Sequence, residues 1–264
     1  MHRSVIWRLQ RVVLHVATPG LLPCASGAAF RVLWYFSLTF LAVMFAACSP
    51  LPGGQASSSG PGVQQVPQAR MVYVAIGASD TYGTGTDDPQ TQSWPVDLAG
   101  KLGSGVRLIN LGIPGIEAHD ALNVELPVAL DAHPTLVTVW LAVNDLVANA
   151  PLTTYAHDLD TLLRRLQAAA PHARVAMANV PDLTLLPRFQ STDTRALHTK
   201  ITSYNAVIAD SVERHHVLLI DLYQQWRTLA AHPEYISDDG FHPNALGYAQ
   251  LAEIFYQALQ KQGS

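Results

Sequence analysis

The sequence has few of the residues that stabilise small exported domains or hold metal ions. Only two cysteines, Cys24 and Cys48, occur among the 264 residues, and both precede the part expected to fold. A disulfide framework is therefore excluded. The chain contains no His-Glu-x-x-His motif and no closely spaced cysteine pair, so its histidines predict no metal site. Since 49% of the residues are hydrophobic, we expect a hydrophobic core to stabilise the fold without cross-links.

The N-terminal segment lacks acidic residues altogether. Residues 1–47 contain four arginines and an apolar stretch, Val32 to Ala47, which together are typical of a signal peptide. The stretch ends in Phe45-Ala46-Ala47-Cys48, which resembles the lipobox of bacterial lipoproteins and implies that Cys48 is lipidated and becomes the new N-terminus. An uncleaved membrane anchor and an ordinary signal peptide are the alternatives. All three predict an exported domain, with the lipid-anchored form on the extracytoplasmic face of the membrane. The long leader also suggests the hypothesis that translation begins downstream of Met1.

The segment after Cys48 lacks hydrophobic periodicity. Residues 48–70 are rich in Gly, Ser, Pro and Gln, so they cannot bury enough apolar surface to fold and are expected to form a flexible tether. Loss of residues 1–47 removes four basic residues and no acidic ones, which leaves 12 basic against 20 acidic residues and a formal net charge of −8. This charge argues against nucleic acid and anionic lipid headgroups as partners.

Residues 71–264 have the pattern of one α/β domain. Hydrophobic runs of strand length alternate with stretches of helical periodicity, which predicts a parallel sheet flanked by helices. Three helical faces are predicted around residues 155–166, 197–212 and 248–259. The five predicted strands are Val72–Ile76, Val106–Asn110, Leu136–Leu141, Arg174–Asn179 and Val217–Asp221.

Polar and glycine residues follow the predicted strands at the edge where ligands bind in parallel sheets. Ser79 follows the first strand, Gly112 and Gly115 the second, and Asn144-Asp145 the third, while Asp239-Gly240-Phe241-His242 lies near the C-terminus. A serine hydroxyl needs a base to take its proton, and a histidine base needs a carboxylate to hold its tautomer. Each motif alone is more often a turn or a helix cap. Their joint occurrence, in this order and at strand ends, favours catalysis.

These four motifs resemble those of the SGNH or GDSL-type esterases and lipases, across roughly residues 71–260. The resemblance implies a flavodoxin-like three-layer α/β/α sandwich with a five-stranded parallel sheet. It also implies a Ser79 nucleophile, a His242 base and an orienting Asp239. No cofactor is expected.

The same resemblance implies an oxyanion hole. It would be formed by the backbone N–H groups of Ser79 and Gly112 and by the Asn144 side-chain amide, all of which are uncharged donors. Two residues depart from the family pattern: Ala78 replaces the aspartate before the nucleophile, and Ala142 replaces a glycine before Asn144. Both changes affect expectations about the substrate more than about the reaction.

The same residues disfavour two other enzyme classes. An α/β-hydrolase elbow needs Gly-x-Ser-x-Gly, whereas Thr81 occupies the last position, and the glycines from Gly77 to Gly85 lack dinucleotide-binding spacing. A non-catalytic surface lipoprotein that binds a glycan or lipid on the same fold is the alternative function.

The expected substrate is a carboxylic ester, either a small molecule, a lipid or a glycan ester. Pocket walls are expected from Tyr82, Trp94, Ile113, Leu146 and residues 182–189, a largely apolar set that fits a short or medium acyl chain. The sequence leaves open whether the substrate is an acyl lipid, a small ester or an O-acetylated sugar.

Overall fold

The structure, a computed structural model, describes residues 70–261. Residues 1–47, Cys48 and nearly all of the expected tether 48–70 lie outside the described residues, so export and lipidation remain predictions. No helix within residues 70–261 is long and apolar enough to cross a membrane.

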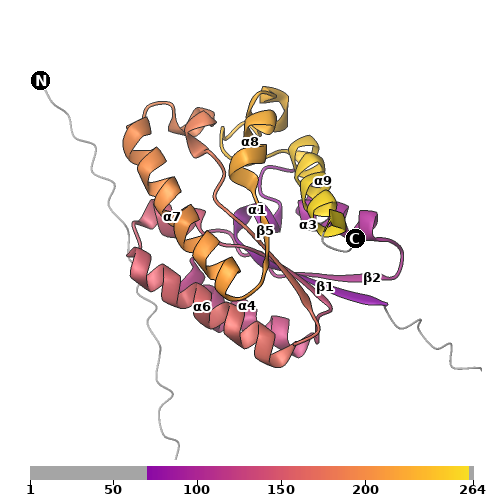
Figure 1. Ribbon diagram of the computed structural model, residues 1–264. Coiled ribbons are helices and arrows are strands. Elements are labelled where there is room, and N and C mark those ends of the chain that lie inside the picture. Colours follow the sequence, from indigo (N-terminus) through magenta and orange to yellow (C-terminus); the bar gives the residue numbers. More distant parts are fainter. Residues whose placement is uncertain (1–69, 262–264) are drawn as a thin grey trace, which may run out of the picture. The chain divides into compact units, whose positions relative to one another are not determined.

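A five-stranded parallel sheet forms the centre of the described part (Figure 1). Its strands lie in the order β2-β1-β3-β4-β5, and every neighbouring pair is parallel. The strands are β1 (Met71–Gly77), β2 (Val106–Asn110), β3 (Leu136–Trp140), β4 (Arg174–Ala178) and β5 (Leu218–Ile220). This confirms the five predicted strands, with small differences at their ends.

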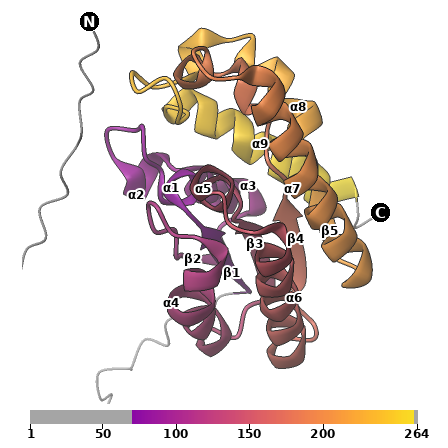
Figure 2. The same cartoon turned by 90° about the vertical axis from the view of Figure 1, so that its left-hand side faces the viewer.

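Helices pack on both faces of the sheet and make three layers (Figures 1 and 2). α4 (Ala118–Asp131), α6 (Leu152–Ala169) and α7 (Thr194–Arg214) form one outer layer, and α3 (Trp94–Leu102) packs on α9 (Ala245–Lys261) in the other. The remaining helices are α1 (Ser79–Tyr82), α2 (Pro89–Gln92), α5 (Val143–Ala148), α8 (Leu222–Ala230), η1 (Leu183–Leu185), η2 (Pro187–Phe189) and η3 (Pro233–Tyr235). The predicted α/β/α sandwich is confirmed.

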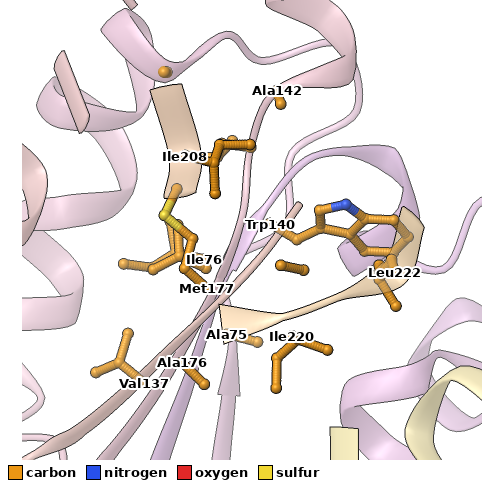
Figure 3. Close-up of a cluster of buried hydrophobic side chains, with 14 of the residues drawn as sticks. Ala75, Ile76, Val137, Trp140, Ala142, Ala176, Met177, Ile208, Ile220 and Leu222 are labelled. Carbon is orange, nitrogen blue, oxygen red and sulfur yellow. The ribbon is translucent and has the colours of Figure 1, made fainter. Parts of the chain in front are cut away.

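The core lies between the sheet and its helices, and the predicted helical faces point into it. Strand residues Ile76, Val137 and Met177 lie with Ile208 of α7 in a cluster of buried hydrophobic side chains (Figure 3). On the other face, the ring of Trp94 stacks on Phe255 with 4.1 Å between centroids. The carboxyl ends of the five parallel strands lie at the same edge of the sheet. Ser79, the Gly112–Gly115 segment and Asn144-Asp145 follow three of these ends, those of β1, β2 and β3.

Candidate active site

Ser79 occupies a tight turn between β1 and α1. The strand ends at Gly77 and the short helix begins two residues later at Ser79, whose side chain is largely buried. A Cβ atom on Gly77 would lie 2.1 Å from Thr81 Oγ1 and 2.9 Å from the Trp140 carbonyl oxygen. Only glycine therefore allows the strand to turn into the helix at this point. This turn holds the Ser79 hydroxyl at the carboxyl edge of the sheet.

Three residues far apart in the sequence form a continuous hydrogen-bonded chain at this edge. Nε2 of His242 lies 2.9 Å from Oγ of Ser79, and Nδ1 of His242 lies 2.5 Å from Oδ2 of Asp239. An ionised Asp239 only accepts hydrogen bonds, so Nδ1 must carry the proton and a neutral ring leaves Nε2 free to accept from the serine hydroxyl. The structure thus brings together Ser79, His242 and Asp239 in the arrangement that base-assisted nucleophilic attack requires.

The Asp239 carboxylate is held in its charged form by four donors. Oδ1 accepts from the Ser237 hydroxyl at 2.9 Å and from the backbone N–H groups of Phe241 and His242 at 2.8 and 2.9 Å. Partial burial raises the pKa of Asp239, but these hydrogen bonds and the one from the His242 ring outweigh it and lower the pKa to about 2. Asp239 therefore remains an acceptor for Nδ1–H at neutral pH.

The loop that bears His242 is fastened to the segment after β4. The backbone N–H of Arg188 donates to the Gly240 carbonyl at 3.0 Å, and the Phe189 ring packs edge-on against Phe241 with 5.7 Å between centroids. Phe241 in turn lies 4.5 Å from the His242 ring. Part of the 182–189 segment thus borders the site, as expected from the sequence.

The expected oxyanion donors differ in their availability. The Asn144 amide donates one N–H to the Ile116 carbonyl at 2.8 Å, which leaves its second N–H for a ligand. The Gly112 N–H, by contrast, donates to the Asn110 side-chain oxygen at 3.0 Å, so it is not free in this structure. A Cβ on Gly112 would lie 2.3 Å from the Tyr82 backbone nitrogen, which gives this glycine a close-packing role.

Gly115 is a backbone donor candidate that the sequence interpretation left without a role. It has a φ of 83° and open space around its Cβ position. Its N–H forms no hydrogen bond within residues 70–261. Its sequence signal is its place in the same Gly112–Gly115 segment, three residues after the predicted donor Gly112.

The expected pocket walls are partly wrong. Tyr82 and Ile113 are 45% and 37% exposed and lie in segments that follow β1 and β2, so they can border the site. Trp94 and Leu146, however, are 0% and 1% exposed and belong to the core. Trp94 is covered because it stacks on Phe255 between α3 and α9.

A second carboxyl group, that of Asp80, lies directly after Ser79. Burial raises the pKa of Asp80 to about 6, although the nearby His242 and the backbone N–H of Asp80 act in the opposite direction.

No group of three or more His, Cys, Asp or Glu side chains within residues 70–261 could hold a metal ion.

The three-layer fold, with serine, histidine and aspartate joined at the carboxyl edge of its sheet, has the architecture of an ester hydrolase. The sequence model of the GDSL-like lipase/acylhydrolase family matches residues 75–250, and the chain belongs to this family of ester hydrolases. A comparison with curated proteins found no match.

Several solved structures share the fold. A structure of TesA aligns with a TM-score of 0.60 at 20% identity, covering 72% of this chain and 99% of that one. A lipase/acylhydrolase from Enterococcus faecalis aligns with a TM-score of 0.60 at 22% identity, covering 73% and 96% of the two chains. The esterase EstA from Pseudoalteromonas sp., inhibited by monoethylphosphonate, aligns with a TM-score of 0.59 at 20% identity, covering 73% and 98%. At these identities the likeness establishes the fold.

Proposed function

We propose that this protein is an exported serine esterase that cleaves carboxylic esters through an acyl-enzyme. The observation that supports it best is the hydrogen-bonded chain from Ser79 through His242 to Asp239, with distances of 2.9 and 2.5 Å. Residues that only cap a turn or a helix do not need to contact one another. Nucleophilic catalysis, by contrast, needs the serine, the histidine and the aspartate to be hydrogen-bonded in this order.

In the first half-reaction, Ser79 Oγ attacks the ester carbonyl carbon while its proton passes to Nε2 of His242. The carbonyl electron pair moves to the oxygen, which becomes an oxyanion. Its collapse re-forms the carbonyl and breaks the bond to the alcohol, which leaves with the proton from Nε2. Asp239 keeps the imidazolium oriented and offsets its charge, which the lowered pKa of the carboxyl group favours.

In the second half-reaction, His242 takes a proton from water as the water oxygen attacks the acyl-enzyme carbonyl. A second oxyanion forms and collapses, the acid leaves, and Ser79 regains its proton. The oxyanion would be stabilised by the Ser79 N–H, the second N–H of Asn144 and a backbone N–H of the Gly112–Gly115 segment. Gly115 suits this third role in the present conformation, because Gly112 would first have to release Asn110.

The substrate would be an ester with an apolar acyl group, held at the edge where Tyr82 and Ile113 are exposed. The structural relatives include an acetyl xylan esterase, AlAXEase, as well as the lipase/acylhydrolase, so an acetylated sugar and an acyl lipid are both to be tested. The protein would act outside the cytoplasm, anchored by a lipid on Cys48. Incorporation of labelled palmitate that persists in Cys48→Ser would refute the anchor.

Hydrolysis of p-nitrophenyl esters of increasing chain length tests the reaction. The full-length protein should turn over these esters, Ser79→Ala should abolish turnover, and a serine-reactive phosphonate should label Ser79 alone. The chain-length optimum separates acetyl from longer acyl substrates. A folded wild-type protein that neither hydrolyses any ester nor reacts with the phosphonate would instead support a non-catalytic lipoprotein that binds a glycan or lipid.

A further inference from the structure

Both side chains of the Asn144-Asp145 pair hold the chain segment that follows β2. Asn144 Nδ2 donates to the Ile116 carbonyl at 2.8 Å, while both carboxylate oxygens of Asp145 accept from the Ala118 N–H at 3.2 Å. The Asp145 side chain is 3% exposed, so these contacts are shielded from water. Two consecutive residues of α5 therefore fix a segment 27 to 28 residues earlier in the chain.

Asp145 caps a helix to which it does not belong. α4 begins at Ala118, and the side chain of Glu117, at the capping position, makes no capping hydrogen bond. The N–H groups at the start of a helix need acceptors, and a carboxylate there also interacts favourably with the helix dipole. Asp145 supplies that acceptor from α5, so the end of the loop and the start of α4 are set by the position of α5.

Keeping the Asp145 carboxylate ionised at this buried position costs free energy. Burial raises the pKa of Asp145 to about 6, partly offset by the N–H groups of Ala118 and of Asp145 itself, and the nearby carboxylates of Glu117 and Asp158 raise it further. Two phenols, those of Tyr155 and Tyr204, are also near enough for Asp145 to raise their pKa values. Within residues 70–261 no basic side chain forms a salt bridge with Asp145. A serine or threonine could cap the helix without this charge.

The hydrogen bond between Asp145 and the Ala118 N–H also affects how the neighbouring Asn144 amide is oriented. The segment it fixes contains Ile116, whose carbonyl orients the Asn144 amide, and lies next to Gly115, whose N–H is unengaged within the described residues. If the segment moves away from α5, the amide loses its orienting partner and the two donors separate. A side chain that only stabilises the helix would leave the donors' geometry unaffected in the folded protein.

We propose that Asp145 is a positioning residue for the oxyanion hole. It joins the segment after β2 to α5, so that the Asn144 amide and the glycine N–H are directed at one oxygen atom. This inference rests on the proposed function, in which that oxygen is the oxyanion of an ester hydrolysis. Asp145 touches neither the substrate nor the reacting atoms and acts through Asn144 and the loop.

A double-mutant cycle tests this role. Asp145→Ala, Asn144→Ala and the double variant are compared for kcat and KM on one p-nitrophenyl ester, in full-length protein whose folding is verified by circular dichroism. Asp145→Asn, which keeps one oxygen acceptor for Ala118, is the conservative variant. Asp158→Asn is the matched control, because Asp158 is a buried carboxylate near Asp145 whose only side-chain partner within residues 70–261 is His119.

The expected result is a loss of kcat in Asp145→Ala of roughly 100-fold, since a displacement of about 1 Å can cost that much. KM should change by less than about twofold, because ground-state binding uses other contacts. The kcat of the double variant should be within about threefold of the kcat of Asn144→Ala, because both substitutions disable the same oxyanion hole. Asp145→Asn should recover most of the lost kcat, and Asp158→Asn should retain the wild-type kcat.

Two results would overturn the inference. One is a folded Asp145→Ala protein with nearly wild-type kcat, and the other is a double variant in which the two losses multiply. A failure of the proposed function is visible separately, because the wild type would then be inactive or Ser79→Ala would retain activity. In that case the positioning role fails with it.

Discussion

Replacing Glu125 by glutamine should stabilise the protein at neutral pH. Glu125 lies on α4 and is 1% exposed. Its Oε1 accepts from the Gly77 N–H at 3.1 Å, while Oε2 is buried without a hydrogen-bond partner among the described residues. Burial raises the pKa of Glu125 to about 8, and the Gly77 N–H offsets only part of this. The carboxyl group is therefore neutral in the folded protein at pH 7 but ionised in the unfolded chain.

The size of the effect follows from the two pKa values. Below the unfolded value of 4.5 both states bind the proton, so Glu125 has no effect on the pH dependence of stability. Between pH 4.5 and about 8 only the unfolded state ionises, and stability falls by 1.36 kcal/mol per pH unit, levelling off above pH 8. The penalty is about 3 kcal/mol at pH 7 and about 1 kcal/mol at pH 5. Glutamine keeps the oxygen acceptor for Gly77 and is neutral at every pH, so it removes this penalty.

Urea unfolding of both proteins at pH 5, 6, 7 and 8 measures this difference. The free energy of unfolding of Glu125→Gln should exceed that of the wild type by an amount that grows steadily with pH. The slope of the unfolding free energy against urea concentration should be the same for both proteins. Asp87→Asn, which makes the same charge change at an exposed position, is the control and should show no such growth. An advantage that is equal at pH 5 and pH 7, or absent at pH 7, would refute the reasoning.

Three further predictions test the site and the core. Asn144→Ala should lower kcat by roughly 100- to 1,000-fold with little change in KM, as measured by ester hydrolysis. Gly112→Ala should lower thermal stability more than Gly115→Ala, because its Cβ would lie 2.3 Å from the Tyr82 backbone nitrogen, whereas Gly115 has open space and only a positive φ to strain. Trp94→Ala should lose about 3–5 kcal/mol in urea unfolding through loss of its core contacts, but Tyr82→Ala should lose less than about 0.5 kcal/mol because its ring is exposed.

The fold could be predicted from the sequence because each strand is a short apolar run followed by turn residues. The differences at the strand ends have local causes. Val217 was expected in the last strand, but its N–H donates to the Val212 carbonyl and closes the turn after α7. Asp221 was also expected there, but its side chain accepts from the Gln224 N–H at the start of α8. In both cases the residue forms a hydrogen bond at the end of a helix instead of extending the strand. A hydrophobic pattern does not predict such a bond.

The site was predictable to the extent that its residues lie in short motifs. Asp239 and His242 are three residues apart and fold into one turn, so their contact follows from local sequence. The pocket walls were not predictable in the same way. Trp94 and Tyr82 are both large aromatic residues near the Ser79 motif, yet one is core and the other surface. Only the packing of α3 against α9 decides between them.

Two of the buried carboxyl groups, those of Glu125 and Asp145, make contacts that no sequence pattern predicts. Glu125 accepts from the N–H of Gly77, two residues before Ser79, and Asp145 accepts from the N–H of Ala118, where the segment after β2 enters α4. Each satisfies a backbone N–H at an end of a regular element, Gly77 at the end of β1 and Ala118 at the start of α4, and each is at least 27 residues from its partner. Strand ladders and helices leave such N–H groups unpaired, and the groups need an acceptor wherever water is excluded. The interior of the fold therefore supplies carboxyl groups directly behind the active-site edge, at positions that no local motif marks.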